Sequence, residues 1–218
     1  MRIRQIFLRG LPGAGKSTFG RLLESRLSDS QYISSGQLLR QAAKTDRNLN
    51  RVLSQGELVD SSIIMNVMIS QLVKHPSPVI ILDGFPRKLT EMKGWISKTT
   101  VPSLVVYLEL PTAAIVQRLL HRTVCSICGI NYNSYSDSET SAVSPHVSNT
   151  CDRCGTPLTQ RPEDTEAIIM ERLKTSLDQE KEITKYLEEL IGKNKILHVN
   201  SLAKNEAVED ILKSFLNE

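Results

Sequence analysis

The sequence predicts an α/β protein whose core is a parallel sheet with helices on both faces, and three observations carry this prediction. Short apolar runs alternate with segments of helical periodicity along most of the 218 residues, which is the pattern of parallel strands joined by helices. A glycine-rich loop at residues 10–18 separates the first apolar run from the first helical segment. Residues 122–160 break the alternation and contain all four cysteines. We therefore expect one large domain that carries a smaller insert.

Five apolar runs are expected to form the sheet. Residues 3–8 favour β structure and run directly into the glycine-rich loop, and residues 79–82 are closed by an Asp-Gly pair. Buried parallel strands have this continuous apolar character. The predicted strands are residues 3–8, 32–33, 79–82, 104–110 and 196–199.

Helical patterns occupy most of the chain between these runs. In residues 16–27, the apolar side chains Phe19, Leu22, Leu23 and Leu27 recur on one side of a helix, as an amphipathic helix requires. Residues 163–191 form a long helical pattern with charged faces. The remaining predicted helices are residues 38–43, 49–54, 61–73, 112–122 and 207–216.

Composition excludes several classes of protein. The chain is 40% hydrophobic and 23% charged, which is ordinary for a globular protein and excludes disorder as the main state. Its formal net charge of +3 is too balanced for a protein that coats nucleic acid. No apolar run approaches the roughly 20 residues of a membrane helix, and Arg9 interrupts the first run too early for a signal peptide. We therefore expect a soluble cytoplasmic protein that binds neither nucleic acid nor membranes.

The cysteines form two CxxC pairs that predict a metal site. The pairs are Cys125 with Cys128 and Cys151 with Cys154, and 22 residues lie between them. Each pair brings two thiolates to one side of a tight turn, and two turns complete a tetrahedron around Zn²⁺. Because all four ligands come from the protein, the predicted site is structural. Two disulfides or four buried thiols are the alternatives, and His146 in the intervening loop is a competing ligand.

The glycine-rich loop matches a phosphate-binding motif in full. Residues 10–18 fit G-x-x-x-x-G-K-[ST] with a strand before and a helix after. The glycines let the backbone wrap a phosphate, and the N–H groups of the loop and of the helix N-terminus point at it. Lys16 is expected to reach the β- and γ-phosphates, and Ser17 to ligate Mg²⁺. The motif predicts a nucleoside triphosphate site but does not separate a kinase from a GTPase or a transport motor.

Further motifs make the chain resemble the adenylate kinase family, in its bacterial form with a long zinc-bearing lid. The resemblance covers nearly the whole chain. It rests on the loop at residues 10–18, residues 33–40, residues 56–59, the Asp-Gly-Phe-Pro-Arg run at residues 83–87, the four cysteines, Arg118, Arg122, Arg161 and Arg172. It implies the P-loop NTPase three-layer fold with a five-stranded parallel sheet. It further implies a core formed by residues 1–33, 60–122 and 161–218, a helical flap for the nucleoside monophosphate at residues 34–59, and a zinc-bearing lid at residues 123–160.

The resemblance implies transfer of the γ-phosphoryl group of ATP to AMP, with Mg²⁺, by a monomer whose lid closes over the reaction. Such a transfer depends on positioning, charge neutralisation and exclusion of water. The expected catalytic residues are Lys16, Arg87, Arg122, Arg161 and Arg172. The expected ATP-binding residues are Gly13, Ala14, Gly15, Lys16, Ser17, Thr18, Arg118, Arg122 and Tyr132. The expected AMP-binding residues are Ser35, Gly36, Arg40, Glu57, Val59, Gly84, Arg87, Glu91, Arg161 and Arg172. Ser17 and Asp83 are expected to hold Mg²⁺, partly through water, and the four cysteines to hold Zn²⁺.

Four features depart from the family pattern. Ser17 stands where the family has Gly, and Gln37 stands where the flap has Asp, so a carboxylate near the magnesium waters is missing. Glu91 stands where the family has a Gln that reads the acceptor adenine. An ionised carboxylate only accepts hydrogen bonds, which would suit the N1–H and N2–H of guanine better. The loop between the cysteine pairs is also longer than the common form.

These departures leave alternatives open. One is a related nucleoside monophosphate kinase whose acceptor base is shifted by Glu91, and another is a catalytically weakened relative with a binding role. A P-loop kinase with a non-nucleotide acceptor is opposed by the run at residues 83–87. A zinc-ribbon nucleic-acid binder or an NTP-driven switch is opposed by residues 123–160, which contain few basic residues and no row of aromatic side chains.

Overall fold

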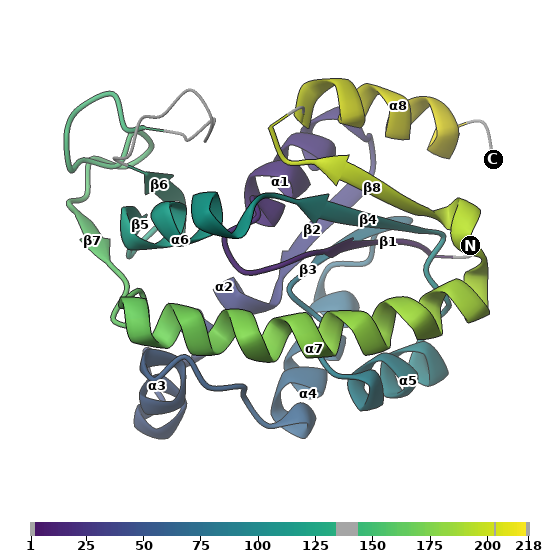
Figure 1. The fold of residues 1–218 in the computed structure, drawn as a ribbon, viewed down its shortest axis with the longest axis horizontal. Coiled ribbons are helices and arrows are strands. Elements are labelled where there is room, and N and C mark those ends of the chain that lie inside the picture. The colour runs from purple at the N-terminus through teal and green to yellow at the C-terminus, as the bar shows by residue number, and fades with distance from the viewer. Residues whose placement is uncertain (1–2, 134–143, 203, 217–218) are drawn as a thin grey trace.

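A five-stranded parallel sheet forms the centre of the molecule, in the strand order β2-β3-β1-β4-β8 (Figure 1). The computed structural model describes residues 3–133, 144–202 and 204–216. All four neighbouring pairs of strands run parallel, as the sequence predicts. The strands of this sheet are β1 (Arg4–Arg9), β2 (Ser30–Ser34), β3 (Val79–Asp83), β4 (Leu104–Glu109) and β8 (Ile196–Asn200).

Helices cover both faces of this sheet and give three layers. Helices α1 and α8 lie on one side, and α4, α5 and α7 lie on the other (Figure 1). None of the described helices is long and apolar enough to cross a bilayer. The helices are α1 (Lys16–Arg26), α2 (Ser35–Ala42), α3 (Arg47–Ser54), α4 (Ser61–Lys74), α5 (Leu89–Lys98), α6 (Thr112–Leu120), α7 (Glu166–Ile191) and α8 (Lys204–Leu216), with a short 3₁₀ turn η1 (Lys193–Lys195).

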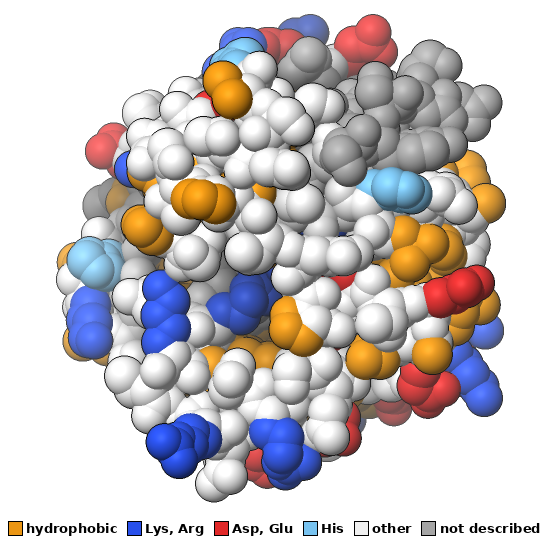
Figure 2. All heavy atoms as spheres, turned by 90° about the vertical axis from the view of Figure 1, so that its left-hand side faces the viewer, with side chains coloured by type: hydrophobic (Ala, Val, Ile, Leu, Met, Phe, Trp, Pro, Cys, Tyr) orange, Lys and Arg blue, Asp and Glu red, His pale blue; other side chains and the backbone are white. Residues whose placement is uncertain are grey.

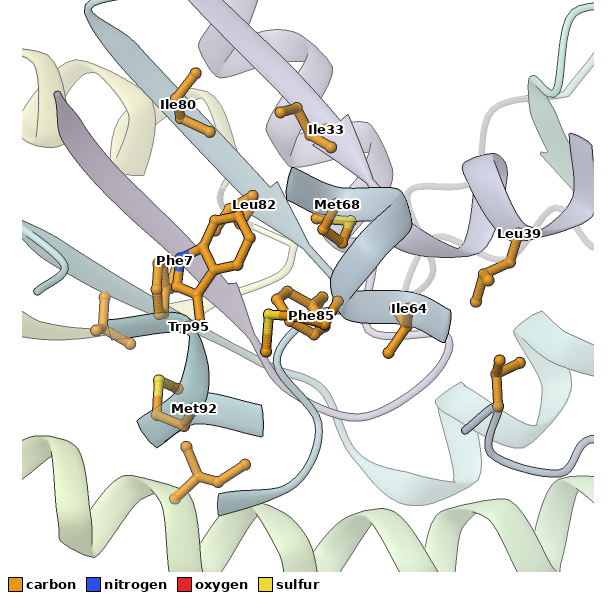
Figure 3. Packing of buried hydrophobic residues seen from close by; sticks show 14 of the residues in the cluster. Phe7, Ile33, Leu39, Ile64, Met68, Ile80, Leu82, Phe85, Met92 and Trp95 are labelled. Atoms are coloured by element: carbon orange, nitrogen blue, oxygen red, sulfur yellow. The ribbon is translucent and has the colours of Figure 1, made fainter. Parts of the chain in front are cut away.

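One hydrophobic cluster lies between the sheet and the layer of α4, α5 and α7, and a second lies on the face of the sheet that α1 and α8 cover. Figure 3 shows the Trp95 indole beside Phe7 and Phe85. The rings of Phe85 and Trp95 meet edge to face with centroids 5.2 Å apart. The indole Nε1–H donates to Gln5 Oε1 at 2.7 Å, so its one polar group is satisfied inside the core. This packing fixes the position of the loop after β3, which carries part of the site.

Two differences from the predicted helices bear on the site. Helix α5 was not predicted, because Gly94 interrupts its helical pattern and lowers its helix propensity. The helix predicted at residues 112–122 ends at Leu120, and Arg122 is instead the first residue of a strand. This correction matters because it places Arg122 on the lid sheet and not on α6.

The insert folds as a small antiparallel sheet with the order β6-β5-β7. Its strands are β5 (Arg122–Cys125), β6 (Asn131–Asn133) and β7 (Leu158–Gln160). These strands are short and form neither a continuous apolar run nor a long alternation, so the sequence patterns did not predict them. Residues 134–143 of the long loop between the cysteine pairs lie outside the described residues. The predicted boundaries of core, flap and lid stay predictions.

Candidate active site

The glycine-rich loop between β1 and α1 presents backbone donors and one lysine to a cleft at the carboxyl end of the sheet. Gly15 precedes α1 with a φ of 91°, a left-handed conformation that glycine adopts without strain. None of the described side chains caps the start of α1, so its first N–H groups can bind an anion. Lys16 Nζ donates to the carbonyls of Gly10 and Leu11 at 2.7 and 2.8 Å, which holds the lysine over the loop.

Arginines from six separate segments line the same cleft as Lys16. Arg40 lies on α2, Arg87 follows β3, Arg118 lies on α6, Arg122 begins β5, Arg161 follows β7 and Arg172 lies on α7. Helices, strands and loops that are far apart in the sequence therefore contribute cations to one space. Of the residues expected at the site, those that line the cleft are Gly13, Gly15, Lys16, Ser17, Thr18, Gly36, Arg40, Asp83, Gly84, Arg87, Arg118, Arg122, Tyr132, Arg161 and Arg172.

Two acidic residues that sequence analysis did not single out orient three of these arginines. The carboxylate of Asp164 accepts hydrogen bonds from Nε and Nη2 of Arg122 at 2.8 and 2.5 Å, and it lies 3.6 Å from Nη1 of Arg172. Glu163 lies 3.8 Å from Nη1 of Arg161. A bidentate contact fixes the plane of a guanidinium group. In the sequence, these two residues could have been found as an acidic pair just after Arg161, at the start of a helical pattern.

The cleft concentrates positive charge in a desolvated place. Burial lowers the pKa of Lys16 to about 8. Burial first, and then repulsion from Arg122, lowers the pKa of Arg172 to about 10. The pKa of Arg161 is held well below its usual range by burial and then by neighbouring arginines. Cations that burial and mutual repulsion destabilise are stabilised by an anion placed among them, so the cleft suits a polyanion.

Asp83 lies at the carboxyl end of β3 and is nearly buried. The hydroxyl of Tyr32 donates to Asp83 Oδ2 at 2.5 Å, and Arg21 lies over the Tyr32 ring, 5.5 Å from its centroid. Ser17 lines the same cleft as Asp83. Carboxylate and hydroxyl oxygens are the hard ligands that Mg²⁺ takes. The donor set therefore fits the magnesium site that the sequence predicts.

Not all residues expected to bind the acceptor reach the cleft. The hydroxyl of Ser35 is turned away and donates to the carbonyl of Gly84 at 2.8 Å. Val59 is packed in the hydrophobic core, and Glu57 is exposed. The expected site residues that do not line the cleft are Ala14, Ser35, Glu57, Val59 and Glu91. Their roles stay predictions.

Glu91 is buried, and its carboxylate serves the start of α5. Oε2 accepts from the backbone N–H groups of Arg87 and Lys88 at 2.8 and 3.3 Å. Oε1 accepts from the hydroxyl of Ser61 at 2.8 Å. A glutamate at the third helical position that bonds back to the helix start satisfies donors that would otherwise lack a partner. The sequence suggested that Glu91 contacts the acceptor base. In the structure, both carboxylate oxygens of Glu91 already accept hydrogen bonds from other groups of the protein.

The segments predicted as flap and lid contact each other across the mouth of the site. Lys44 Nζ donates to the carbonyl of Ser126 at 3.1 Å. Gln37 accepts from Arg21 Nη2 at 3.1 Å, and its side chain packs so closely on Gly129 that a Cβ there would lie 3.0 Å from Gln37 Nε2. Residues of both units line a second hollow, and Figure 2 shows a hollow on this side with a basic side chain at its floor. The two segments are therefore in contact in this structure.

The four cysteines gather in the lid as the two CxxC pairs predict. All four are free thiols, so the two disulfides considered as an alternative are not formed. A tetrahedron with Zn–S bonds of about 2.3 Å spaces its sulfurs about 3.8 Å apart, and Sγ of Cys125 lies 3.5 Å from Sγ of Cys154. His146 is 89% exposed and faces Asp152 instead. The sulfurs that lie within 4.8 Å of one another belong to Cys125, Cys128, Cys151 and Cys154.

Two more charged residues line the cleft without having been expected there. Arg9 is the last residue of β1, and Glu180 lies on α7. A signal for each was present in the sequence. Arg9 is a charge that ends an apolar strand directly before the glycine-rich loop. Glu180 is eight positions after Arg172 and so lies near the same face of the helix.

Comparison with known proteins agrees with this site. The family model described as adenylate kinase matches residues 8–191. The chain is 32% identical to the adenylate kinase of Hydrogenobaculum sp. (strain Y04AAS1), over 97% of this chain and 99% of that protein. It is 30% identical to the adenylate kinase of Thermosipho africanus (strain TCF52B), over 99% and 98%. It is 33% identical to the GTP:AMP phosphotransferase of Plasmodium falciparum (isolate 3D7), over 78% and 79%. This chain therefore belongs to the adenylate kinase family.

Proposed function

We propose that this protein transfers the γ-phosphoryl group of ATP to AMP and yields two ADP. The observation that carries the proposal is the single cleft in which Lys16 faces arginines from the flap, the lid and the core. The phosphates of two nucleotides supply the negative charge that these buried cations lack. Relatives named as adenylate kinases and as a GTP:AMP phosphotransferase act on AMP by their names, which supports AMP as the acceptor.

The positions of the cations suggest how the transfer proceeds. The donor phosphates lie in the glycine-rich loop, while Arg40 and Arg87 hold the acceptor phosphate. An oxygen of the acceptor attacks the γ-phosphorus in line, and the bond to the β,γ-bridging oxygen breaks. Lys16 neutralises the charge that develops on the leaving ADP. Arg122, Arg161 and Arg172 neutralise the transferring group, and the closed lid excludes water that would otherwise hydrolyse ATP.

Two metal ions complete the proposal. Ser17 and Asp83 would hold the Mg²⁺ that accompanies ATP, Asp83 partly through water, and the ion would neutralise charge on the donor phosphates. The hydroxyl of Tyr32 donates to one oxygen of Asp83, and Asp83 lines the cleft. Zn²⁺ would occupy the four cysteines, because soft thiolates at tetrahedral spacing favour it. A site closed by four protein ligands is structural, so Zn²⁺ would hold the lid together without joining the reaction.

The contacts of Glu91 remove the reason to expect a shift from AMP to GMP. Recognition of guanine by Glu91 would require a carboxylate edge that is open to the base. Instead, both oxygens of Glu91 already accept hydrogen bonds from Ser61 and from the start of α5. We therefore expect Glu91→Gln to leave the acceptor preference almost unchanged. A monomeric state and a cytoplasmic location stay predictions of the sequence.

A parallel assay tests the proposal. Formation of diphosphate is measured with ATP or GTP as donor and with AMP, GMP, CMP and UMP as acceptors, with and without Mg²⁺. We expect the fastest transfer from ATP to AMP with Mg²⁺, and a loss of about a hundredfold or more in Lys16→Met. Lack of transfer by the wild-type protein, or equal transfer to GMP, contradicts the proposal. Faster transfer from GTP would change only the donor.

A further inference from the structure

A buried ion pair lies in the cleft beside the groups that the proposed reaction uses. Arg9 Nη2 lies 2.9 Å from Glu180 Oε2, and the side chains are 4% and 14% exposed. Arg9 Nε donates to the same carboxylate oxygen at 3.1 Å. Both residues line the cleft together with Lys16 and Arg87. A carboxylate in a cavity that has to receive several phosphates repels its ligands, so its presence there requires a reason.

Arg9 joins three parts of the site. It is the last residue before the glycine-rich loop, and it is paired with α7 through Glu180. Its Nη1 also donates to the carbonyl of Pro86. Pro86 directly precedes Arg87, whose own Nε donates to the carbonyl of Gly84 at 2.8 Å. Arg9 therefore links the phosphate loop to the segment that carries Arg87.

Glu180 balances the charge that Arg9 brings. Burial is the main cause of the lowered pKa values of Lys16 and Arg87; beside it, Glu180 raises both pKa values and Arg9 lowers both. Nη2 of Arg9 is buried and has no hydrogen-bond acceptor of good geometry among the described residues. Without Glu180, this group would be a free phosphate ligand displaced from the reacting position.

We propose that Arg9 and Glu180 act as a neutral positioning pair for the phosphoryl transfer, in which Arg9 holds the Pro86–Arg87 segment against the phosphate loop and Glu180 keeps Arg9 from binding phosphate itself. This inference rests on the proposed function, because it assigns a role inside the same cleft. Neither residue is a catalytic residue, since both act through Arg87 and Lys16. The proposal makes opposite predictions for the two halves of the pair.

Single substitutions separate the two roles. Glu180→Gln leaves an uncompensated cation that binds phosphates in a non-productive position, so KM for AMP should fall about threefold while kcat falls about tenfold. Arg9→Gln leaves an uncompensated carboxylate and frees the Pro86–Arg87 segment, so KM for AMP should rise about tenfold and kcat should fall. Arg9→Lys keeps the positive charge but lacks the planar guanidinium group. Its KM for AMP should equal that of the wild type, whereas its kcat should stay low.

The experiment compares these variants with the double variant and with an exposed control. Arg26 and Glu209 form a pair at 2.9 Å whose side chains are 53% and 50% exposed, so Arg26→Gln controls for the loss of a cation outside the cleft. Steady-state kinetics give KM and kcat, and calorimetry gives the affinity for ADP. Opposite shifts in KM for the two single variants, with KM recovered in the double variant, support the pair. Shifts in the same direction, or a loss of thermal stability with unchanged KM and kcat, overturn it.

Binding of ADP keeps this test separate from the test of the reaction. If the wild-type protein binds ADP but transfers no phosphoryl group, the proposed function fails. The affinities of Glu180→Gln and Arg9→Gln for ADP still have to shift in opposite directions. If the wild-type protein is active and these affinities equal that of the wild type, only the positioning pair is wrong.

Discussion

The core and the lid of this protein contribute to one cleft, yet they are stabilised in different ways. The core surrounds its sheet with large, fully buried side chains such as Trp95, Phe7 and Phe19. The buried cluster of the lid consists of Cys125, Tyr132 and Cys151, with few apolar neighbours. A module of this size cannot bury enough apolar surface to fold by itself and needs a staple.

Because the core and the lid are stabilised in different ways, we expect the two halves of the cleft to respond differently when one of them is perturbed. Lys16 and Arg87 are attached to the core, whereas Arg122 and Arg161 are attached to strands of the lid. Loss of the lid would remove cations from the transferring group without disturbing the phosphate loop. Predictions that affect one region and spare the other therefore test this comparison.

Metal removal should give the largest effect, and it should be confined to the lid. Structural zinc contributes about 10–16 kcal/mol to the folding of small modules. After chelation, amides of β5, β6 and β7 should exchange fast, while those of β1, β3 and β4 stay protected, as measured by hydrogen exchange with mass spectrometry. Cys151→Ser should reproduce this pattern, and Ser126→Ala in the first CxxC turn should not. Unchanged protection of the lid without metal would show that the lid folds by packing alone.

Trp95→Ala should give the next largest effect, confined to the core. Removal of a buried aromatic side chain costs about 3–5 kcal/mol of unfolding free energy, which urea denaturation of the metal-loaded protein measures. Trp95→Phe is the matched control. It keeps most of the apolar volume but loses the hydrogen bond to Gln5, and should cost about 1–3 kcal/mol. Metal content should be equal in both variants. A loss below about 1 kcal/mol for Trp95→Ala would contradict the assignment of the core.

The pH dependence of nucleotide binding should reveal the buried lysine on the core side of the cleft. Burial lowers the pKa of Lys16 to about 8 in the free protein, whereas phosphate binds the ammonium form. Above this pH, binding has to take up a proton, so ADP affinity should fall about tenfold per pH unit. Calorimetry between pH 7 and 10 measures this slope, and Lys16→Met should remove it. The same affinity at both ends of the range would mean that Lys16 keeps its ordinary pKa.

The linkage to stability has the opposite sign. The folded pKa of Lys16 lies below its ordinary value of 10.5, so the unfolded chain binds the proton more tightly. Between about pH 8 and 10.5 the free energy of unfolding should therefore gain a contribution from Lys16 as the pH rises. That contribution is absent in Lys16→Met.

Tyr132→Phe should give the smallest effect, and it should be confined to the metal site. The Tyr132 hydroxyl lies 3.5 Å from Cys151 Sγ and accepts from the N–H of Asp152 at 3.0 Å. Loss of this link should cost about 1 kcal/mol, or roughly fivefold in metal affinity, measured by competition with a chromophoric chelator. Tyr32→Phe is the control, because its hydroxyl serves Asp83 in the core. Equal metal affinities in the wild type, Tyr132→Phe and Tyr32→Phe would show that Tyr132 does not contribute to metal binding.

Local patterns were enough to predict much of this molecule. The strands, the phosphate loop and the cysteine cluster were predictable because periodicity and short fixed spacings express local geometry. Helix α5 was not predicted because Gly94 weakens its helical pattern, although Trp95 packs the helix in the core. The lid strands were not predicted because they are short and none of them is a continuous apolar run.

The phosphate loop and the cysteine pairs could be found without a structure, since residues 10–18 and the CxxC pairs each contain a whole local binding unit. The pairing of distant charges became visible only in the folded chain. Folding paired Arg9 with Glu180, which lies 171 positions away, set Asp164 between Arg122 and Arg172, and engaged Glu91 at a helix start. The physical reason is that the energy of a buried charge depends on its solvation and on the groups beside it, and folding alone determines both.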